Sequence, residues 1–378
     1  MNKLRVLITN VCLDNRTGTE TYVYDLAREL VRLGHVPFVY SPRLGEIAFE
    51  LRRKGIIVVD DLDQVREAPD IIHGHHYIET LQALLFFPEA PALFVCHDPT
   101  AWHSEPPVTE RISRYIAVSD PTLGRLIEHS IPKEKTAMFF NAVDLSRFKE
   151  CSRSLPAKPR RALIFASYAD DYNFIRPIQK TCAALGITVD MAVLGLGRAV
   201  PEPENVLGQY DVVFAKARCA WEAMACGASV IPCGVEGCSP MVTLKNVEEF
   251  QRFNFAVKPI VTPVTSSFLK EQLLSYDPAE TGKVTRWVRQ NVSLEGLAVK
   301  YVALYHTIIE ERRKILASQP DYLQKAQKDL LRRICGDLEA RIVETKRVGA
   351  LAERICQLLQ EIGRKLRTRF KNLLERFS

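Results

Sequence analysis

Residues 4–34 read LRVLITNVCLDNRTGTETYVYDLARELVRLG, and this stretch sets the pattern of the fold. LRVLITN (4–10) is a short apolar run with β-branched residues, which is typical of a strand buried on both faces. A polar loop follows, and TYVYDLARELVRLG (21–34) has apolar residues at helical spacing with Gly34 as its C-cap. The stretch therefore predicts a strand, a loop and a helix, the repeating unit of a parallel α/β sheet.

The same alternation continues along the chain. The next strands are predicted at HVPFVYS (35–41), IIVVDD (56–61), DIIHGH (70–75), ALFVCHD (92–98) and RYIAVS (114–119). After the polar loop CSRSLPAKPR (151–160) a second series begins, with strands at RALIFAS, ITVDMAVLG, YDVVFAK and ASVIPCG. We expect an α/β protein made of two Rossmann-like domains in tandem, whose strand ends address one cleft.

The domain organisation predicted from these patterns has four parts. They are an N-terminal Rossmann-like domain (1–152), a second Rossmann-like domain (153–298), a helix crossing back to the first domain (299–318) and a helical tail (319–378). The tail carries an apolar stripe and is basic from 361 to 378. Packing on protein, self-association and contact with an anionic membrane surface all fit such a helix, and the sequence leaves the three open.

Composition excludes several classes of protein. The chain has 378 residues, 47% apolar, with a net charge of +6, which alone does not indicate nucleic-acid binding. The ten cysteines include no CxxC pair, and a zinc site at Cys219, Cys226, Cys233 and Cys238 would fit no common spacing. Buried, reduced thiols and the missing signal peptide predict a cytoplasmic protein, with the inner face of the membrane as an alternative place for the tail.

Six segments in order resemble the family 4 group of GT-B glycosyltransferases. They are TGTETYVYDLARELVRLGH, DIIHGH, VCHD, RYIAVS, FFNAVDLSRF (139–148) and YDVVFAKARCAWEAMACGASVI. In FFNAVDLSRF, Ala142 replaces the glycine of the family signature. The similarity covers about residues 4–310.

The resemblance implies transfer of a sugar from a nucleotide-sugar to a glycan or glycolipid acceptor, with retention of configuration and without a metal. The nucleotide-sugar is then a substrate, and no cofactor is expected. By position, Glu222 matches the carboxylate that accepts the ribose hydroxyls, and Gly18 matches the loop glycine beside the diphosphate. His97 matches the histidine facing the reacting sugar, the expected catalytic residue. Asp98 and His103 follow it in the acceptor-side loop.

Two departures from the family pattern matter for activity. Phe214 stands where the family has a first glutamate, eight positions before Glu222. The family's diphosphate-binding Arg and Lys are replaced by the acidic stretch ALIFASYADDYNFIRP. We expect Lys216 and Arg218 to take over the diphosphate, the alternative being that they are solvated loop residues.

Three functions remain open from the sequence. The first is an active hexosyl- or related transferase acting on a cell-surface polysaccharide or glycolipid. The second is a GT-B pseudoenzyme that binds nucleotide and assembles through its tail, which the loss of the first glutamate favours. The third is a nucleotide-sugar epimerase of the same fold, which would need further acids and bases.

Overall fold

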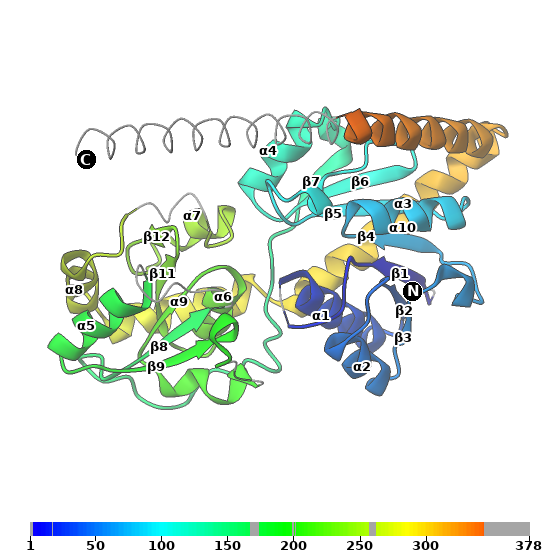
Figure 1. Cartoon of the computed structure of the whole chain (residues 1–378). Coiled ribbons are helices and arrows are strands. Elements are labelled where there is room, and N and C mark those ends of the chain that lie inside the picture. The colour runs from blue at the N-terminus through cyan, green and yellow to red at the C-terminus, as the bar shows by residue number, and fades with distance from the viewer. Residues whose placement is uncertain are drawn as a thin grey trace, which may run out of the picture. The chain divides into compact units, whose positions relative to one another are not determined.

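The computed structural model describes residues 3–16, 18–166, 174–198, 200, 202–256 and 262–343. The chain separates into two compact units, Met1–Gln319 and Pro320–Ser378. The first unit holds two sheets, blue to cyan and green in Figure 1. The predicted fold class, an α/β protein with two tandem Rossmann-like domains and a helical C-terminal region, is confirmed.

Seven parallel strands form the first sheet, in the order β3-β2-β1-β4-β5-β6-β7. They are β1 (Arg5–Thr9), β2 (Val36–Tyr40), β3 (Ile57–Val59), β4 (Ile71–Gly74), β5 (Ala92–Cys96), β6 (Ile112–Ala117) and β7 (Thr136–Met138). The chain moves outward from β1 to β3 and then returns to place β4 on the other side of β1. Such a switch point opens a crevice at the carboxyl ends of the strands, where ligands of open α/β sheets bind.

Helices pack against the strands of both domains, because the apolar faces of helices and sheets must be buried against one another. Those of the first sheet are α1 (Gly18–Arg32), α2 (Glu46–Arg53), α3 (Tyr77–Phe86), α4 (Asp120–Glu128) and α10 (Leu294–Ser318). α1, α2 and α10 share one core with the strands, to which α10 contributes Tyr301 and Tyr305. A helix that follows the second domain in sequence therefore completes the core of the first, as Figure 1 shows for the yellow α10.

The second sheet has the order β12-β11-β10-β8-β9 and is parallel except for β12. Its strands are β8 (Arg161–Ala166), β9 (Thr188–Val193), β10 (Val212–Ala215), β11 (Ser229–Gly234) and β12 (Gly237–Cys238). Its helices are α5 (Arg176–Ala184), α6 (Ala217–Ala225), α7 (Val247–Arg252), α8 (Ser266–Leu274) and α9 (Pro278–Asn291). One core contains residues of α5 and α8, and a separate core contains those of α6, α7 and α9, so two helical layers cover the sheet.

The helix predicted at 299–318 is longer at its start. α10 begins at Leu294 because the Ser293 hydroxyl accepts a hydrogen bond from the Gly296 amide at 3.2 Å, an N-cap. Helices α3, α7, α8 and α9 were not among the predicted elements. α3 is apolar on most of its surface, so its sequence lacks the amphipathic period that marks α1.

Residues 322–343 of the second unit are helical, as the apolar stripe predicts. Along this stripe Leu330 is buried, whereas Leu338 and Ile342 are more than half exposed. The basic stretch 361–378 lies outside the described residues, so the predicted membrane contact or self-association of the tail stays a prediction. Within the described part of the chain, no helix has the length and apolar character that a membrane span needs.

Candidate functional site

Two histidines meet at the carboxyl ends of neighbouring strands. His75 follows β4 and His97 follows β5, and these two strands are parallel and paired, with Gly74 opposite Phe94. His75 Nδ1 and His97 Nε2 lie 2.6 Å apart, so one ring donates a hydrogen bond to the other. The predicted catalytic histidine therefore has a partner that fixes its ring, which the sequence prediction did not include.

Both rings are uncharged at neutral pH. Burial lowers the pKa of His97 to about 3, against the opposing effect of Asp98, and burial lowers the pKa of His75 well below its usual range. Their hydrogen bond therefore joins two neutral imidazoles, each with one N–H. Among the described residues His75 Nε2 has no hydrogen-bond partner, so the pair keeps hydrogen-bonding capacity that none of these residues uses.

Tyrosines surround this histidine pair. Tyr22 of α1 packs edge-on against both rings, with ring centroids 5.3 Å from His75 and 4.9 Å from His97. Its hydroxyl lies 2.7 Å from that of Tyr301 on α10. His73 Nδ1 lies 2.5 Å from the Tyr305 hydroxyl, and burial lowers the pKa of His73 to about 3. The first and the last helix of this unit therefore hold the histidines in place.

The two residues predicted for the acceptor-side loop have different surroundings. The Asp98 carboxylate accepts hydrogen bonds from the amides of Thr100 (2.7 Å) and Ala101 (2.6 Å). Burial alone would raise the pKa of Asp98, but these bonds outweigh it and lower the pKa. Asp98 thus shapes the loop after β5, whereas His103, in the 3₁₀ turn η2 (Trp102–Ser104), lies with its ring centroid 5.1 Å from that of His76.

Gly18 is the first residue of α1 and is exposed. A Cβ atom at this position would meet nothing within 4 Å, so the protein's own packing does not require a glycine. Its backbone φ does not require one either. Close approach of a ligand to the helix N-terminus stays the predicted reason for this glycine.

Glu222 lies on α6 and is paired with Arg218 one helical turn earlier, Nε to Oε1 2.7 Å. Only 5% of the Glu222 side chain is exposed. Burial raises the pKa of Glu222, and the charges of Arg218 and Arg147 act against that rise. The cation that a buried carboxylate needs is therefore supplied by the same helix.

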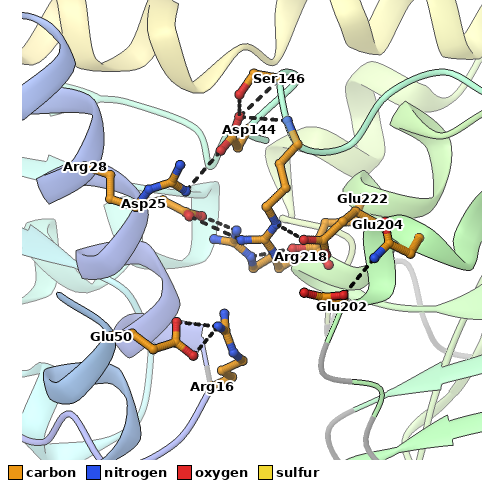
Figure 2. A network of polar contacts seen from close by, with 12 residues as sticks. Arg16, Asp25, Arg28, Glu50, Asp144, Ser146, Glu202, Glu204, Arg218 and Glu222 are labelled. Carbon is orange, nitrogen blue, oxygen red and sulfur yellow. Dashed lines mark hydrogen bonds and ion pairs between the residues drawn. The ribbon is translucent and has the colours of Figure 1, made fainter. Parts of the chain in front are cut away.

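Arg218 also reaches a carboxylate that sequence reasoning missed. Its Nη2 donates to Asp25 on α1, a contact between residues 193 positions apart, and only 2% of the Asp25 side chain is exposed. The other Asp25 oxygen is 3.7 Å from Arg147, whose Nε is 3.0 Å from Glu204. Figure 2 shows this network between α1 on one side and α6 on the other.

Lys216 comes just before α6, as its N-cap residue, and binds Glu236 through both carboxylate oxygens at 2.7 and 2.9 Å. The two cations predicted for the diphosphate therefore both contact carboxylates in this structure. They differ in burial, because 30% of the Lys216 side chain and 40% of its partner are exposed, against 20% of Arg218. Between them Ala217 has φ 50°, a left-handed conformation rare for a residue with a Cβ.

Phe214 is fully buried in β10 and belongs to the core that contains α5 and α8. The position that the predicted resemblance aligns with a first glutamate therefore faces the interior of the second domain in this chain. A carboxylate at this point would be desolvated without a partner, so phenylalanine is compatible with the local packing and glutamate is not.

Other features of the described residues do not form a site of this kind. A cavity of about 780 Å³ is lined by Arg5, Val36 and Ile57, which begin β1, β2 and β3, so it lies at the opposite ends of the strands from His97. Within the described ranges, no group of three or more His, Cys, Asp or Glu side chains is arranged to hold a metal ion.

Comparison with known proteins identifies the type of fold. Residues 16–147 match the model of Glycosyltransferase Family 4. A glycosyltransferase from Rickettsia africae is similar over 82% of this chain and 99% of its own, with a TM-score of 0.59 and 14% identity. The Anabaena HepE protein in complex with UDP and glucose is similar over 80% of this chain and 100% of its own, with a TM-score of 0.58 and 14% identity.

Sucrose-phosphate synthase from Thermosynechococcus elongatus is also similar, with a TM-score of 0.55 and 14% identity, over 82% of this chain and 100% of its own. A search of curated protein sequences finds no match to this chain. The chain has the GT-B fold, and the predicted resemblance to family 4 glycosyltransferases is confirmed by the fold and by the match of the N-terminal domain.

Proposed function

We propose that this GT-B protein, whose N-terminal domain resembles family 4 glycosyltransferases, transfers a sugar from a nucleotide-sugar to a glycan or glycolipid acceptor, with retention of configuration and without a metal. The observation that carries the proposal is His97, a neutral imidazole held at the carboxyl end of β5 by His75. HepE, a structural neighbour, has been solved with UDP and with UDP-glucose, which supports a uridine diphosphate sugar as the first donor to test.

His97 is the residue we assign to the reacting sugar. A neutral ring can donate one hydrogen bond to a sugar hydroxyl or accept one from it, and it adds no positive charge beside a developing oxocarbenium ion. The hydrogen bond to His75 and the Tyr22 ring restrict its rotation. Holding the imidazole in one orientation reduces the reorganisation needed during the reaction.

Glu222 is the residue we assign to the ribose. Oε1 binds Arg218, which leaves Oε2 as the acceptor for the ribose hydroxyls. Arg218 keeps the carboxylate ionised and fixes its rotamer, while Asp25 holds Arg218 from α1. In this arrangement Arg218 supports the ribose acceptor, and a role at the diphosphate requires it to leave one of two buried carboxylates.

Lys216 is the better of the two predicted diphosphate ligands. Its ion pair with Glu236 is partly exposed, and such pairs contribute at most about 1 kcal/mol, so exchange for a phosphate oxygen costs little. The backbone amides at the N-terminus of α1, beside Gly18, can bind a second phosphate oxygen. These groups supply positive charge without a metal ion.

A nucleotide-binding GT-B protein without transferase activity is the second candidate. The burial of Phe214 in β10 favours it, because the carboxylate that family members place near the donor sugar has no counterpart at this position. Donor hydrolysis separates the two functions, since many transferases transfer their sugar slowly to water.

The test is a screen of UDP-, GDP- and dTDP-sugars by thermal shift, followed by hydrolysis of the donor that binds. We expect one donor to raise the melting temperature and to be hydrolysed, and His97→Ala to lower the hydrolysis rate about 100-fold while binding persists. His129→Ala, at the end of α4, is the matched control and should keep the full rate. Binding without hydrolysis would support the second candidate, and no shift with any donor would contradict both.

A further inference from the structure

A second cavity, of about 420 Å³, lies along α1 and α2 and is not part of the histidine site. Its lining includes Arg16 before α1, Tyr24 and Arg28 on α1, and Arg53 and Lys54 at the end of α2. Glu50 of α2, Arg147 and two glutamates near the 3₁₀ turn η6 (Pro203–Asn205) complete it. We call this the basic cavity.

Positive charge exceeds negative charge in the basic cavity. Five cations line it, Arg16, Arg28, Arg53, Lys54 and Arg147, against three carboxylates, Glu50, Glu202 and Glu204. The excess is two positive charges, the difference between five and three. A concave surface with an excess of one sign concentrates ligands of the opposite sign.

The internal ion pairs leave two cations at the end of α2 available. Arg16 binds Glu50 at 2.5 Å, and Arg147 binds Glu204 at 3.0 Å. Neither Arg53 nor Lys54 makes an ion pair with any of the described residues, and both are exposed. The Arg53 guanidinium packs on the Phe49 ring at 5.9 Å, which leaves its donors free to bind an anion.

The ring of Tyr24, which lines the cavity, orders two further guanidinium groups. Arg16 and Arg28 both pack on Tyr24, at 5.5 and 5.3 Å from the ring centroid. Arg28 also binds Asp144 at 3.4 Å. Figure 2 shows Arg16, Arg28 and Glu50 on the blue elements facing Glu202 and Glu204 on the green ones. Guanidinium groups held in this way lose less entropy when they bind an anion.

We propose that the basic cavity binds a phosphate-bearing group, a phosphomonoester or a diphosphate. Planar guanidinium forks match phosphate oxygens, and the lysine adds a point charge. Two substrates of the proposed reaction present that group: the acceptor, through a phosphate of its own, and the donor, whose diphosphate would then bind here in place of Lys216. The binding does not require sugar transfer, so its failure would leave the proposed function standing.

The test is titration of inorganic pyrophosphate into the full chain by calorimetry. We expect Arg53→Ala/Lys54→Ala to weaken pyrophosphate binding about tenfold or more, because two charge-assisted contacts are lost. Lys270→Ala/Lys300→Ala removes two exposed lysines from other elements and has the same net charge, so it should bind as the unmodified protein does. Binding should also weaken at high salt.

Titration after saturation with UDP separates the two sources. If UDP and pyrophosphate compete, and the Arg53/Lys54 variant binds each of them more weakly, the cavity is assigned to the donor. Pyrophosphate that still binds to the UDP-saturated protein assigns it to the acceptor. The proposal is overturned if the unmodified protein does not bind pyrophosphate, or if the two double variants bind it equally while both keep the melting temperature of the unmodified protein.

Discussion

The histidine cluster and the arginine network are both buried, but the histidines are neutral whereas the arginine stays charged. His73, His75 and His97 have lowered pKa values and remain neutral, with hydrogen bonds to each other or to tyrosine. Arg218 stays charged between Asp25 and Glu222. A group with a neutral partner loses its charge on burial, whereas a group with an ionic partner keeps it.

Removal of one charge from the arginine network should have the largest effect on stability. Arg218→Met leaves Asp25 and Glu222 buried without their common cation, and we expect a loss of about 3–5 kcal/mol in unfolding free energy. Urea denaturation measures it. Arg313→Met, which breaks a pair with Glu310 whose arginine is 73% exposed, is the control, and its loss should stay below about 1 kcal/mol.

Equal losses in Arg218→Met and Arg313→Met would show that the network contributes no more than a surface pair. A triple variant, Arg218→Met with Asp25→Asn and Glu222→Gln, removes all three charges and should recover part of the stability. This recovery would identify unpaired charge, rather than lost packing, as the cause.

Removal of one hydroxyl from the histidine cluster should have a smaller effect. Tyr305→Phe leaves His73 Nδ1 buried without a partner, so we expect a loss of about 1–3 kcal/mol. Tyr276→Phe is a matched control, because the Tyr276 hydroxyl is buried and has no hydrogen-bond partner among the described residues. Its removal should be neutral or stabilising, and an equal loss in both variants would contradict the importance of the bond to His73.

The two regions should also respond to pH with opposite signs. The three histidines bind protons more weakly in the folded state than in the unfolded chain, so they destabilise the fold as pH falls from about 6.5 toward about 3. Glu222 has a raised pKa in the folded state, so its protonation acts in the other direction at the acid end.

The destabilising effect of protonating the three histidines should exceed the opposite effect of the single carboxyl group of Glu222. We therefore expect the free energy of unfolding to decrease between pH 7 and pH 5. His73→Phe should flatten that decrease, since one proton fewer is taken up on unfolding. Urea denaturation at each pH measures the slope. An unchanged slope in the variant would show that His73 does not titrate differently in the two states.

The smallest effect concerns the backbone beside the network. Ala217 has φ 50°, where glycine is favoured, so Ala217→Gly should be neutral or stabilising by up to about 1 kcal/mol. Ala223→Gly in the same helix is the control and should destabilise by about 1 kcal/mol. Thermal denaturation compares the two, and a larger loss for Ala217→Gly would contradict a left-handed conformation at this residue.

Much of the fold could be predicted because buried parallel strands have continuous apolar sequences. The observed strands β1 and β8 lie inside the predicted segments LRVLITN (4–10) and RALIFAS (161–167). Their ends differ from the predicted ends by no more than one residue. The local pair Arg218–Glu222 also follows from helical spacing. Asp25 could not be found in this way, because its contact with Arg218 joins residues 193 positions apart and depends on how two domains meet.

The contact between the two histidines could be predicted only in part. His75 and His97 were both expected at strand ends, but their contact depends on β4 being the direct neighbour of β5 in the sheet. Strand order is a tertiary property that apolar runs do not encode. The assignment of Lys216 and Arg218 to the diphosphate rested on their charge and on their position beside the donor segment. The sequence did not indicate that Glu236 and Asp25 contact them.

The most direct test of the account is the binding of UDP and of its 2′,3′-dideoxy analogue to the unmodified protein and to Glu222→Gln. If Glu222 accepts the ribose hydroxyls of a nucleotide-sugar, the unmodified protein should bind UDP at least about tenfold more tightly than the analogue. Glu222→Gln should bind both weakly and nearly equally. Equal affinity of the unmodified protein for the two ligands, or no binding of UDP and other nucleotides at all, would contradict the proposed nucleotide-sugar site.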